Sequence, residues 1–320
     1  MARSPVSSPV ALPGTSTSRV PGRPIAWHLF LSLRPGQWTK NLLVFAGVLF
    51  GNASVGRGLF DPDPLLRATA AFALFCALSG VVYLVNDISD RESDRQHPLK
   101  AKRPIASGAL PVGLAGVAAV VIAAAALAGS AMLGRGFLLV AVGYLALQLL
   151  YSGPLKQIVI IDVLAIAMGF VLRAVAGAVV VQVEISHWLL VCTILLALFM
   201  ALAKRRHEIV LLADGAASHR PILGEYSAYL LDQMIAVVTA STLIAYVFYT
   251  ISPETQEKFG TPWLGLTIPF PLYGIFRYLY LVHRRDGGGS PAELLLTDRP
   301  LLACVALWAL AVALIIYQPS

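Results

Sequence analysis

The stretch PLLRATAAFALFCALSGVVYLV, residues 64–85, runs directly into NDISDRESD, residues 86–94. Its first part is apolar apart from Arg67 and a few small polar residues. That length matches the roughly 20 residues that a helix needs to cross about 30 Å of hydrocarbon. Its second part places acidic residues just beyond the apolar run. The sequence therefore predicts a membrane-spanning helix that ends in a cluster of carboxylates.

The rest of the chain has the same apolar character. Of its 320 residues, 58% are hydrophobic and only 13% are charged, and the mean hydropathy is +0.75. This exceeds what a soluble domain needs to cover one core. We therefore predict an all-α integral membrane protein with nine spanning helices. The predicted spans lie roughly at 38–56, 64–85, 110–132, 134–151, 158–182, 187–203, 233–251, 262–282 and 299–317.

The placement of basic residues predicts the orientation of these spans. Most of the 24 Lys and Arg residues precede the first span or fall in alternate loops. Short loops rich in Lys and Arg stay on the cytoplasmic side of a cell membrane. We therefore expect the N-terminus inside, the C-terminus outside and the carboxylate cluster facing the cytoplasm. The expected cytoplasmic loops are 86–109, 152–157, 204–232 and 283–299.

The net charge of +7 does not by itself indicate a nucleic-acid-binding protein. Because the basic residues gather at expected membrane edges, their natural partners are anionic headgroups and phosphorylated substrates, and nucleic acid is not an expected partner. Cys76, Cys192 and Cys304 lie inside apolar runs without the close pairing of a zinc site or a disulfide framework. We interpret them as packing residues.

The polar N-terminal segment differs from everything after it. Residues 1–25 are rich in Ser, Pro, Thr and Gly and contain no apolar core segment, so we expect a disordered cytoplasmic tail. The polar stretches within 26–320 are too short to fold alone. We therefore treat 26–320 as one transmembrane domain. A homo-oligomer is compatible with the sequence, which does not fix the oligomeric state.

The acidic residues after the second predicted span are spaced as a ligand set. Asp87, Asp90 and Asp94 follow the spacing i, i+3, i+7, which predicts one helix face with Asn86 beside it. Carboxylates stacked in this way repel each other unless cations neutralise them, and Mg²⁺ prefers a few carboxylate oxygens together with phosphate oxygens. We interpret Asn86, Asp87, Asp90 and Asp94 as a magnesium site. A solvated loop face is the alternative.

A basic run follows at once, HPLKAKRPIASG at 97–108. Arg can bind phosphate oxygens through a bidentate fork, whereas Lys acts as a point charge. Cations beside a magnesium site suit a diphosphate, so we take Lys102 and Arg103 as candidate binding residues. Lys100 is explained at least equally well by the orientation rule alone, which is the alternative for the whole run.

The acidic motif and the basic run together resemble the first aspartate-rich motif of the UbiA superfamily of intramembrane prenyltransferases. The resemblance extends over roughly 30–315. It implies nine transmembrane helices around a central cavity, with Mg²⁺ and a diphosphate bound at cytoplasmic caps, and it implies catalytic roles for Asp87 and Asp90. The further matching segments are RPGQWTKN at 34–41, YSGPLK at 151–156 and KRRHE at 204–208.

One departure from the family pattern points to a particular branch. The second motif of the superfamily carries several aspartates, but only Asp162 stands at the start of the fifth predicted span. With the segments at 34–41 and 204–208, this variant resembles the decaprenyl-phosphate phosphoribosyltransferases. That resemblance implies transfer from 5-phosphoribosyl diphosphate to a polyprenyl phosphate, for cell-wall arabinan synthesis. We take Asp162, an ionisable residue inside a predicted span, as a third catalytic candidate.

Asp162 and Arg173 both lie inside a predicted span, where ionisable residues are costly and usually functional. Arg173 is the deeper of the two, where it could meet an acidic partner or a lipid phosphate. A structural role that locks helices together is the alternative for both. The remaining substrate-binding candidates are Lys40, Asn41, Tyr151, Lys156, Lys204 and Arg205. A salt-bridge network with Arg206 and Glu208 is the alternative for Arg205.

Two rival functions stay open at this point. A UbiA-type prenyltransferase would use a prenyl diphosphate as donor, and more aspartates near 158–170 would have favoured it. A transporter could also keep Asp and Arg in its spans, but inverted repeats and broken helices near the midplane would be expected of it.

Overall fold

The computed structural model describes residues 24–96, 100–184, 186–212, 221–284, 294 and 297–317. Within these ranges the chain is helical and contains no strand, which confirms the predicted all-α class. Nearly all of the predicted N-terminal tail lies outside the described residues.

Seven helices of the described chain are long and apolar enough to cross a membrane. Each falls on one of the predicted spans, which identifies the chain as a multi-pass membrane protein. The seven are α3 (Pro62–Ser89), α5 (Val112–Met132), α6 (Arg135–Ser152), α7 (Ile161–Val181), α8 (His187–Leu212), α10 (Ala228–Ile251) and α14 (Arg299–Ile316).

The other two predicted spans form less regular structure. The run at 38–56 becomes the 3₁₀ segment η1 (Pro35–Phe45), the π turn η2 (Gly47–Gly51) and the short α2 (Asn52–Ser54). The run at 262–282 is divided between the 3₁₀ turn η7 (Trp263–Thr267) and α12 (Pro269–Arg284). Proline lacks a backbone N–H and favours the first turn of a helix, so α12 begins at Pro269.

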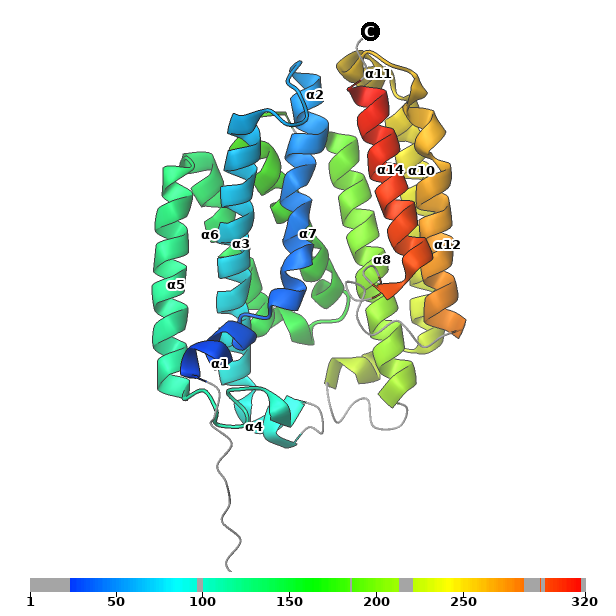
Figure 1. The fold of residues 1–320 in the computed structure, drawn as a ribbon. Coiled ribbons are helices and arrows are strands. Elements are labelled where there is room, and N and C mark those ends of the chain that lie inside the picture. Colours follow the sequence, from blue (N-terminus) through cyan, green and yellow to red (C-terminus); the bar gives the residue numbers. More distant parts are fainter. Residues whose placement is uncertain are drawn as a thin grey trace, which may run out of the picture.

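Short elements close the two ends of the bundle (Figure 1). α4 and α1 lie at one end, whereas α2 and α11 lie at the other. The 3₁₀ turns η3, η4 and η6 connect the longer helices. These elements are α1 (Ile25–Ser32), α4 (Arg91–Gln96), η3 (Lys100–Lys102), η4 (Leu155–Gln157), η6 (Pro221–Glu225) and α11 (Pro253–Phe259).

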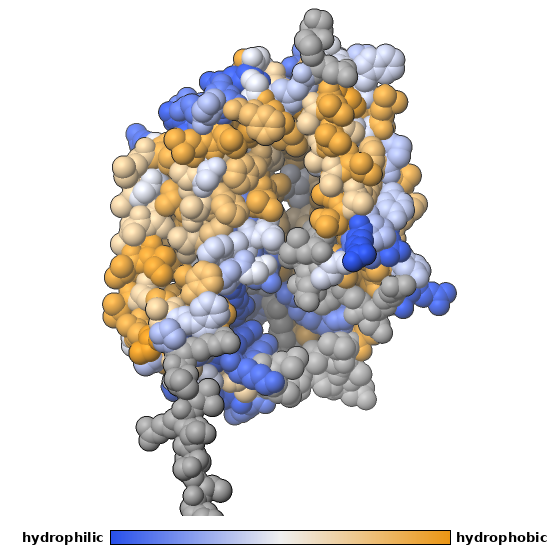
Figure 2. All heavy atoms as spheres, in the orientation of Figure 1, coloured by the Kyte–Doolittle hydropathy of each residue, from blue (hydrophilic) through white to orange (hydrophobic). Residues whose placement is uncertain are grey.

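α7 is the central helix of the arrangement. It contacts α3, α6 and η1 on one side and α8 on the other, while α10 packs on α8 and α14 packs on α12. The outer flanks expose large apolar side chains such as Val120 at 70% and Met132 at 89%. Figure 2 shows apolar side chains over the flanks and hydrophilic ones gathered toward the ends. Large apolar side chains exposed along the flanks are suited to contact with the hydrocarbon of a membrane and not with water.

Two glycines let η1 and η2 pack directly against α7. A Cβ at Gly47 would collide with the backbone of Gly177, and a Cβ at Gly177 would collide with the backbone of Val44. Only glycine permits this close backbone approach. The contact brings Asn41 of η1 to Arg173, one turn before Gly177 on α7.

Candidate active site

The acidic motif is built from two helices and not from one. α3 ends at Ser89, Asp90 is its C-cap residue, and α4 begins at Arg91. The predicted single helix face is therefore wrong, because the chain leaves the helix at Asp90, where φ is −91° and ψ is 7°. The Asp94 amide donates to the Asp90 carbonyl at 2.8 Å, which holds α4 close to the end of α3.

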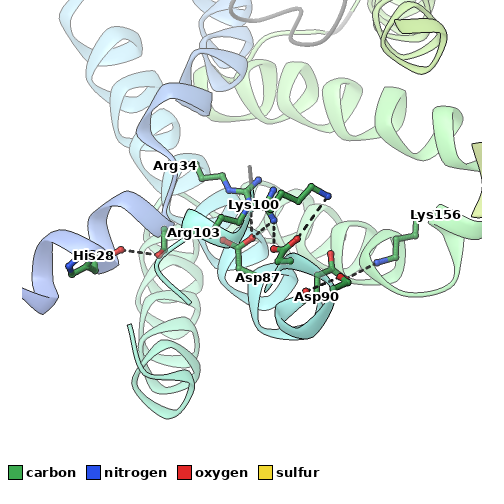
Figure 3. Close-up of polar contacts among 10 residues, drawn as sticks. His28, Arg34, Asp87, Asp90, Lys100, Arg103 and Lys156 are labelled. Atoms are coloured by element: carbon green, nitrogen blue, oxygen red, sulfur yellow. Dashed lines mark hydrogen bonds and ion pairs between the residues drawn. The ribbon is translucent and has the colours of Figure 1, made fainter. Parts of the chain in front are cut away.

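Asp87 and Asp94 are buried together around Arg103. The Arg103 Nη1 atom lies 3.1 Å from Asp87 Oδ1 and 2.5 Å from Asp94 Oδ2. The two acidic side chains are only 3% and 2% exposed. Lys100 Nζ approaches Asp94 at 3.9 Å. Two buried carboxylates are stable here because cations neutralise them (Figure 3).

Arg34 also binds Asp87, although it was not among the site residues predicted from the sequence. Its Nη2 atom lies 2.5 Å from Asp87 Oδ1, and its guanidinium carbon lies 4.6 Å above the centre of the Tyr83 ring. Arg34 precedes Pro35 and has a φ of 52°, a region that few non-glycine residues adopt. The available signal was its position at the start of the RPGQWTKN segment.

The other candidates of the first motif are placed differently. Asp90 turns away from Asp87 and approaches Lys156 of η4, whose Nζ atom lies 3.5 Å from Asp90 Oδ1 (Figure 3). Asn86 is half-buried beside the pair, and its side chain has no hydrogen-bond partner among the described residues. Lys102 is exposed and makes no contact with these carboxylates in the described chain. The structure thus brings Lys100, and not Lys102, to the acidic pair.

A second charged network surrounds Asp162 at the start of α7. Asp162 is fully buried, and its Oδ2 atom accepts a hydrogen bond from Arg205 Nε at 2.9 Å. Arg205 also donates to Glu208 Oε2 at 2.6 Å and to the Tyr151 hydroxyl at 3.1 Å. Arg205 therefore binds two other predicted site residues, Asp162 and Tyr151. This geometry supports the helix-locking role that the sequence left open for Asp162.

Tyr226 completes the second network, although it was not among the site residues predicted from the sequence. Its hydroxyl donates to Asp162 Oδ1 at 2.8 Å and accepts from the Ile160 amide at 2.7 Å. Ile160 has a φ of 68°, which is strained for a β-branched residue. Burial, together with the neighbouring Asp162, raises the pKa of Tyr226 to about 12. Tyr226 therefore keeps its proton at neutral pH and remains a donor.

Tyr226→Phe is expected to destabilise the protein because it removes the hydrogen-bond partner of the Ile160 amide and the donor to Oδ1 of the buried Asp162. The loss of unfolding free energy should be about 1–3 kcal/mol, measured by denaturant unfolding in detergent. Tyr278→Phe is the matched control. Tyr278 is buried in the same apolar cluster, but its hydroxyl has no partner among the described residues. Equal stability losses in the two variants would contradict the assigned role.

Asn41 and Arg173 meet in the interior, between η1 and α7. Arg173 is 6% exposed, and its Nε atom donates to Asn41 Oδ1 at 2.7 Å. It also donates to the Gly169 carbonyl at 2.9 Å and to the Tyr144 hydroxyl at 2.8 Å. No carboxylate partner of Arg173 occurs in the part of the chain that the structure describes. The acidic partner that the sequence allowed is thus absent from the described residues.

Lys40 lies near this buried arginine, and Lys204 lies near Lys40. The charges of Lys204, Arg173 and Arg34 all act on Lys40. Lys204 forms a long ion pair with Glu208 at 3.9 Å, whereas Lys40 has no ion pair among the described residues. The interior between the two networks is therefore rich in positive charge.

The sequence of residues 44–297 matches the model of the UbiA prenyltransferase family. The chain belongs to this family. Membership identifies it as a transferase, and the two polar networks at one end of the bundle are its candidate active site.

Relatives and solved structures agree with this family assignment. The chain is 34% identical to a decaprenyl-phosphate phosphoribosyltransferase of Corynebacterium glutamicum over 302 residues, 93% of this chain and 90% of the relative. It is also 34% identical to the enzyme of that name from Mycobacterium tuberculosis H37Rv, over 87% of this chain and 90% of the relative. A UbiA homologue from Archaeoglobus fulgidus bound to GPP and Mg²⁺ has the same fold, with a TM-score of 0.69. It is 20% identical and covers 91% of this chain and 100% of its own.

The first motif of this UbiA-family chain fits a magnesium ion only with help from substrate. Among the described residues, no three His, Cys, Asp or Glu side chains could hold a metal ion as a group. Asp87 and Asp94, however, share the same Arg103 atom and offer hard oxygen donors. Mg²⁺ is often held by one or two carboxylates plus substrate phosphates. The residues therefore fit a metal that arrives with a diphosphate.

Proposed function

We propose that the protein transfers a 5-phosphoribosyl group from phosphoribosyl diphosphate to a polyprenyl phosphate, such as decaprenyl phosphate, and releases pyrophosphate. The observation that carries this proposal is the 34% identity, over about nine-tenths of both chains, to decaprenyl-phosphate phosphoribosyltransferases. The buried acidic pair with its ring of cations supports a diphosphate donor. The product would serve cell-wall arabinan synthesis.

In this reaction the bond between ribose C1 and the diphosphate oxygen breaks, and the oxygen takes the electron pair. An oxygen of the lipid phosphate forms the new bond at C1 from the opposite face, so inversion is expected. This nucleophile is already an anion, and no general base is required. The main tasks of the protein are therefore to position the substrates and to stabilise charge on the departing pyrophosphate.

The first network consists of Asp87, Asp94, Arg34, Lys100 and Arg103. It is suited to stabilising charge on the departing pyrophosphate. Arg34 and Arg103 both lie within hydrogen-bond distance of Asp87, and each guanidinium has further N–H groups that could bind diphosphate oxygens. Lys100 adds a point charge beside Asp94. Asp87 and Asp94 would hold Mg²⁺, which, when bound, would neutralise part of the diphosphate charge. The ion pair between Asp90 and Lys156 would hold η4 against the end of α3 beside this site.

The same proposal includes the orientation of the protein. We place it in the plasma membrane with this end of the bundle facing the cytoplasm, as the loop charges predict. The irregular segments 35–54 and 263–284 would be the two further crossings of a nine-span bundle. The N-terminal segment 1–25 would be a cytoplasmic tail, followed by one transmembrane domain.

Purified protein with Mg²⁺, a polyprenyl phosphate and radiolabelled phosphoribosyl diphosphate is expected to yield lipid-linked label and pyrophosphate. The rival donor is tested in the same preparation, because the A. fulgidus homologue binds GPP. Protein that consumes geranyl diphosphate with an isoprenoid acceptor, but produces no phosphoribosyl lipid, would overturn the proposal and leave the family assignment intact.

A further inference from the structure

Arg173 is a buried cation without a compensating anion in the described chain. Its three hydrogen-bond partners in the described chain, Asn41, Gly169 and Tyr144, are all neutral. The rings of Tyr144 and Phe170 lie 4.9 and 5.1 Å from its guanidinium carbon, which offsets only part of the charge. Buried charges in proteins are normally paired or bound to a ligand. A guanidinium carries five N–H donors, so two of them remain for a ligand.

Lys40 is a second cation without an anionic partner in the described chain, and it is half-buried. It belongs to η1, directly before Asn41, which Arg173 binds. Arg34, Arg173 and Lys204 are all close enough for their charges to act on Lys40. Arg34 and Lys204 have carboxylate partners in Asp87 and Glu208, whereas Lys40 and Arg173 have none among the described residues. Two adjacent cations without an anion predict an anion-binding site.

We propose that Lys40 and Arg173 form a subsite for a phosphate monoester, distinct from the diphosphate site at Asp87, Asp94 and Arg103. Tyr144 and Asn41 hold the Arg173 guanidinium in place, and Lys40 supplies a flexible point charge. A monoester bears up to two negative charges and matches the two cations.

The inference rests on the proposed function in one respect, which is that both proposed substrates carry a phosphate monoester. One is the 5-phosphate of the donor, and the other is the phosphate of the lipid acceptor. The diphosphate group is expected at the first network in either case. The chemistry of the subsite is the same for both sources, so the experiment has an arm for each.

Equilibrium binding without turnover tests the subsite separately from the reaction. The purified protein is titrated, in the presence of Mg²⁺, with ribose 5-phosphate, a short-chain polyprenyl phosphate and pyrophosphate. Lys40→Gln is expected to weaken binding of a monoester by about ten-fold or more and to change pyrophosphate binding by less than about two-fold. Arg103→Gln is expected to give the opposite pattern.

Two further variants test whether weaker monoester binding comes from the changed binding group or from a general loss of folded structure. Arg173→Lys keeps the charge but loses the planar fork, and it should weaken monoester binding while pyrophosphate binding is retained. Arg57→Gln is the control, because Arg57 also binds a neutral carbonyl, that of Val181 at 3.1 Å. It should leave all three ligands unaffected.

Each outcome of these titrations bears on the proposal. A loss for ribose 5-phosphate assigns the subsite to the donor, and a loss confined to the polyprenyl phosphate assigns it to the acceptor. Equal effects of Lys40→Gln on monoester and pyrophosphate, no effect on either, or no monoester binding by the unmodified protein would overturn the proposal. Failure of the transfer assay with intact monoester binding would instead overturn the proposed function alone.

Discussion

Asp87→Asn is expected to reduce phosphoribosyl transfer by about 10³-fold while the protein still folds. Asparagine preserves the size of the side chain and one carbonyl oxygen, but it removes the charge on which Arg34 and Arg103 converge. The two guanidinium groups would then lack a fixed anion between them, and the metal would lose a carboxylate ligand. Most of the loss should appear in kcat, because charge on the leaving pyrophosphate develops only in the transition state.

The control for this variant lies on the same helix. Asp63 is near the opposite end of α3, is largely exposed and pairs with Arg67 at 3.0 Å. Asp63→Asn should change transfer by less than about two-fold, since an exposed pair contributes little. Both variants are compared by initial rates of lipid-linked label and by their unfolding temperatures in detergent. Transfer by Asp87→Asn at more than about one-tenth of the original rate would argue against a central role for Asp87.

The seven long helices could be predicted from the sequence because hydropathy acts over about 20 residues and needs no knowledge of tertiary contacts. The segment at 38–56 shows the limit of that reasoning. Its residues are apolar, but the close glycine contact with α7 and the start at Pro35 produce a 3₁₀ and π conformation. The nine-span count therefore stays a prediction.

The position of the acidic motif could be predicted from the sequence, but its three-dimensional arrangement could not. Spacing identified Asp87, Asp90 and Asp94, but the helix ends between them, and so Asp90 faces Lys156 instead of its neighbours. Tyr226 and Arg34 reach the networks from segments far away in the chain. Sequence spacing carries no information about such contacts, and the ligand roles of all these residues stay predictions.

Asp162→Asn is expected to lower the unfolding free energy by about 3–5 kcal/mol, because it removes one of the two carboxylates that pair with the buried Arg205. Glu208 still pairs with Arg205 at 2.6 Å, which places the expected loss toward the lower end of that range. Unfolding in a denaturing-detergent titration measures the loss. The double variant Asp162→Leu with Arg205→Met should lose less than the sum of its single variants, since no buried charge is left alone.

The transfer rate of these variants decides what Asp162 does. Both of its carboxylate oxygens are occupied, one by Arg205 and one by Tyr226. If the carboxylate only holds α7, α8 and Tyr226 together, the folded fraction of Asp162→Asn should keep transfer within about ten-fold of the original rate, well above Asp87→Asn. A folded Asp162→Asn protein as inactive as Asp87→Asn would show that the carboxylate contacts a substrate. Its hydrogen bonds to Arg205 and Tyr226 would then have to open during the reaction.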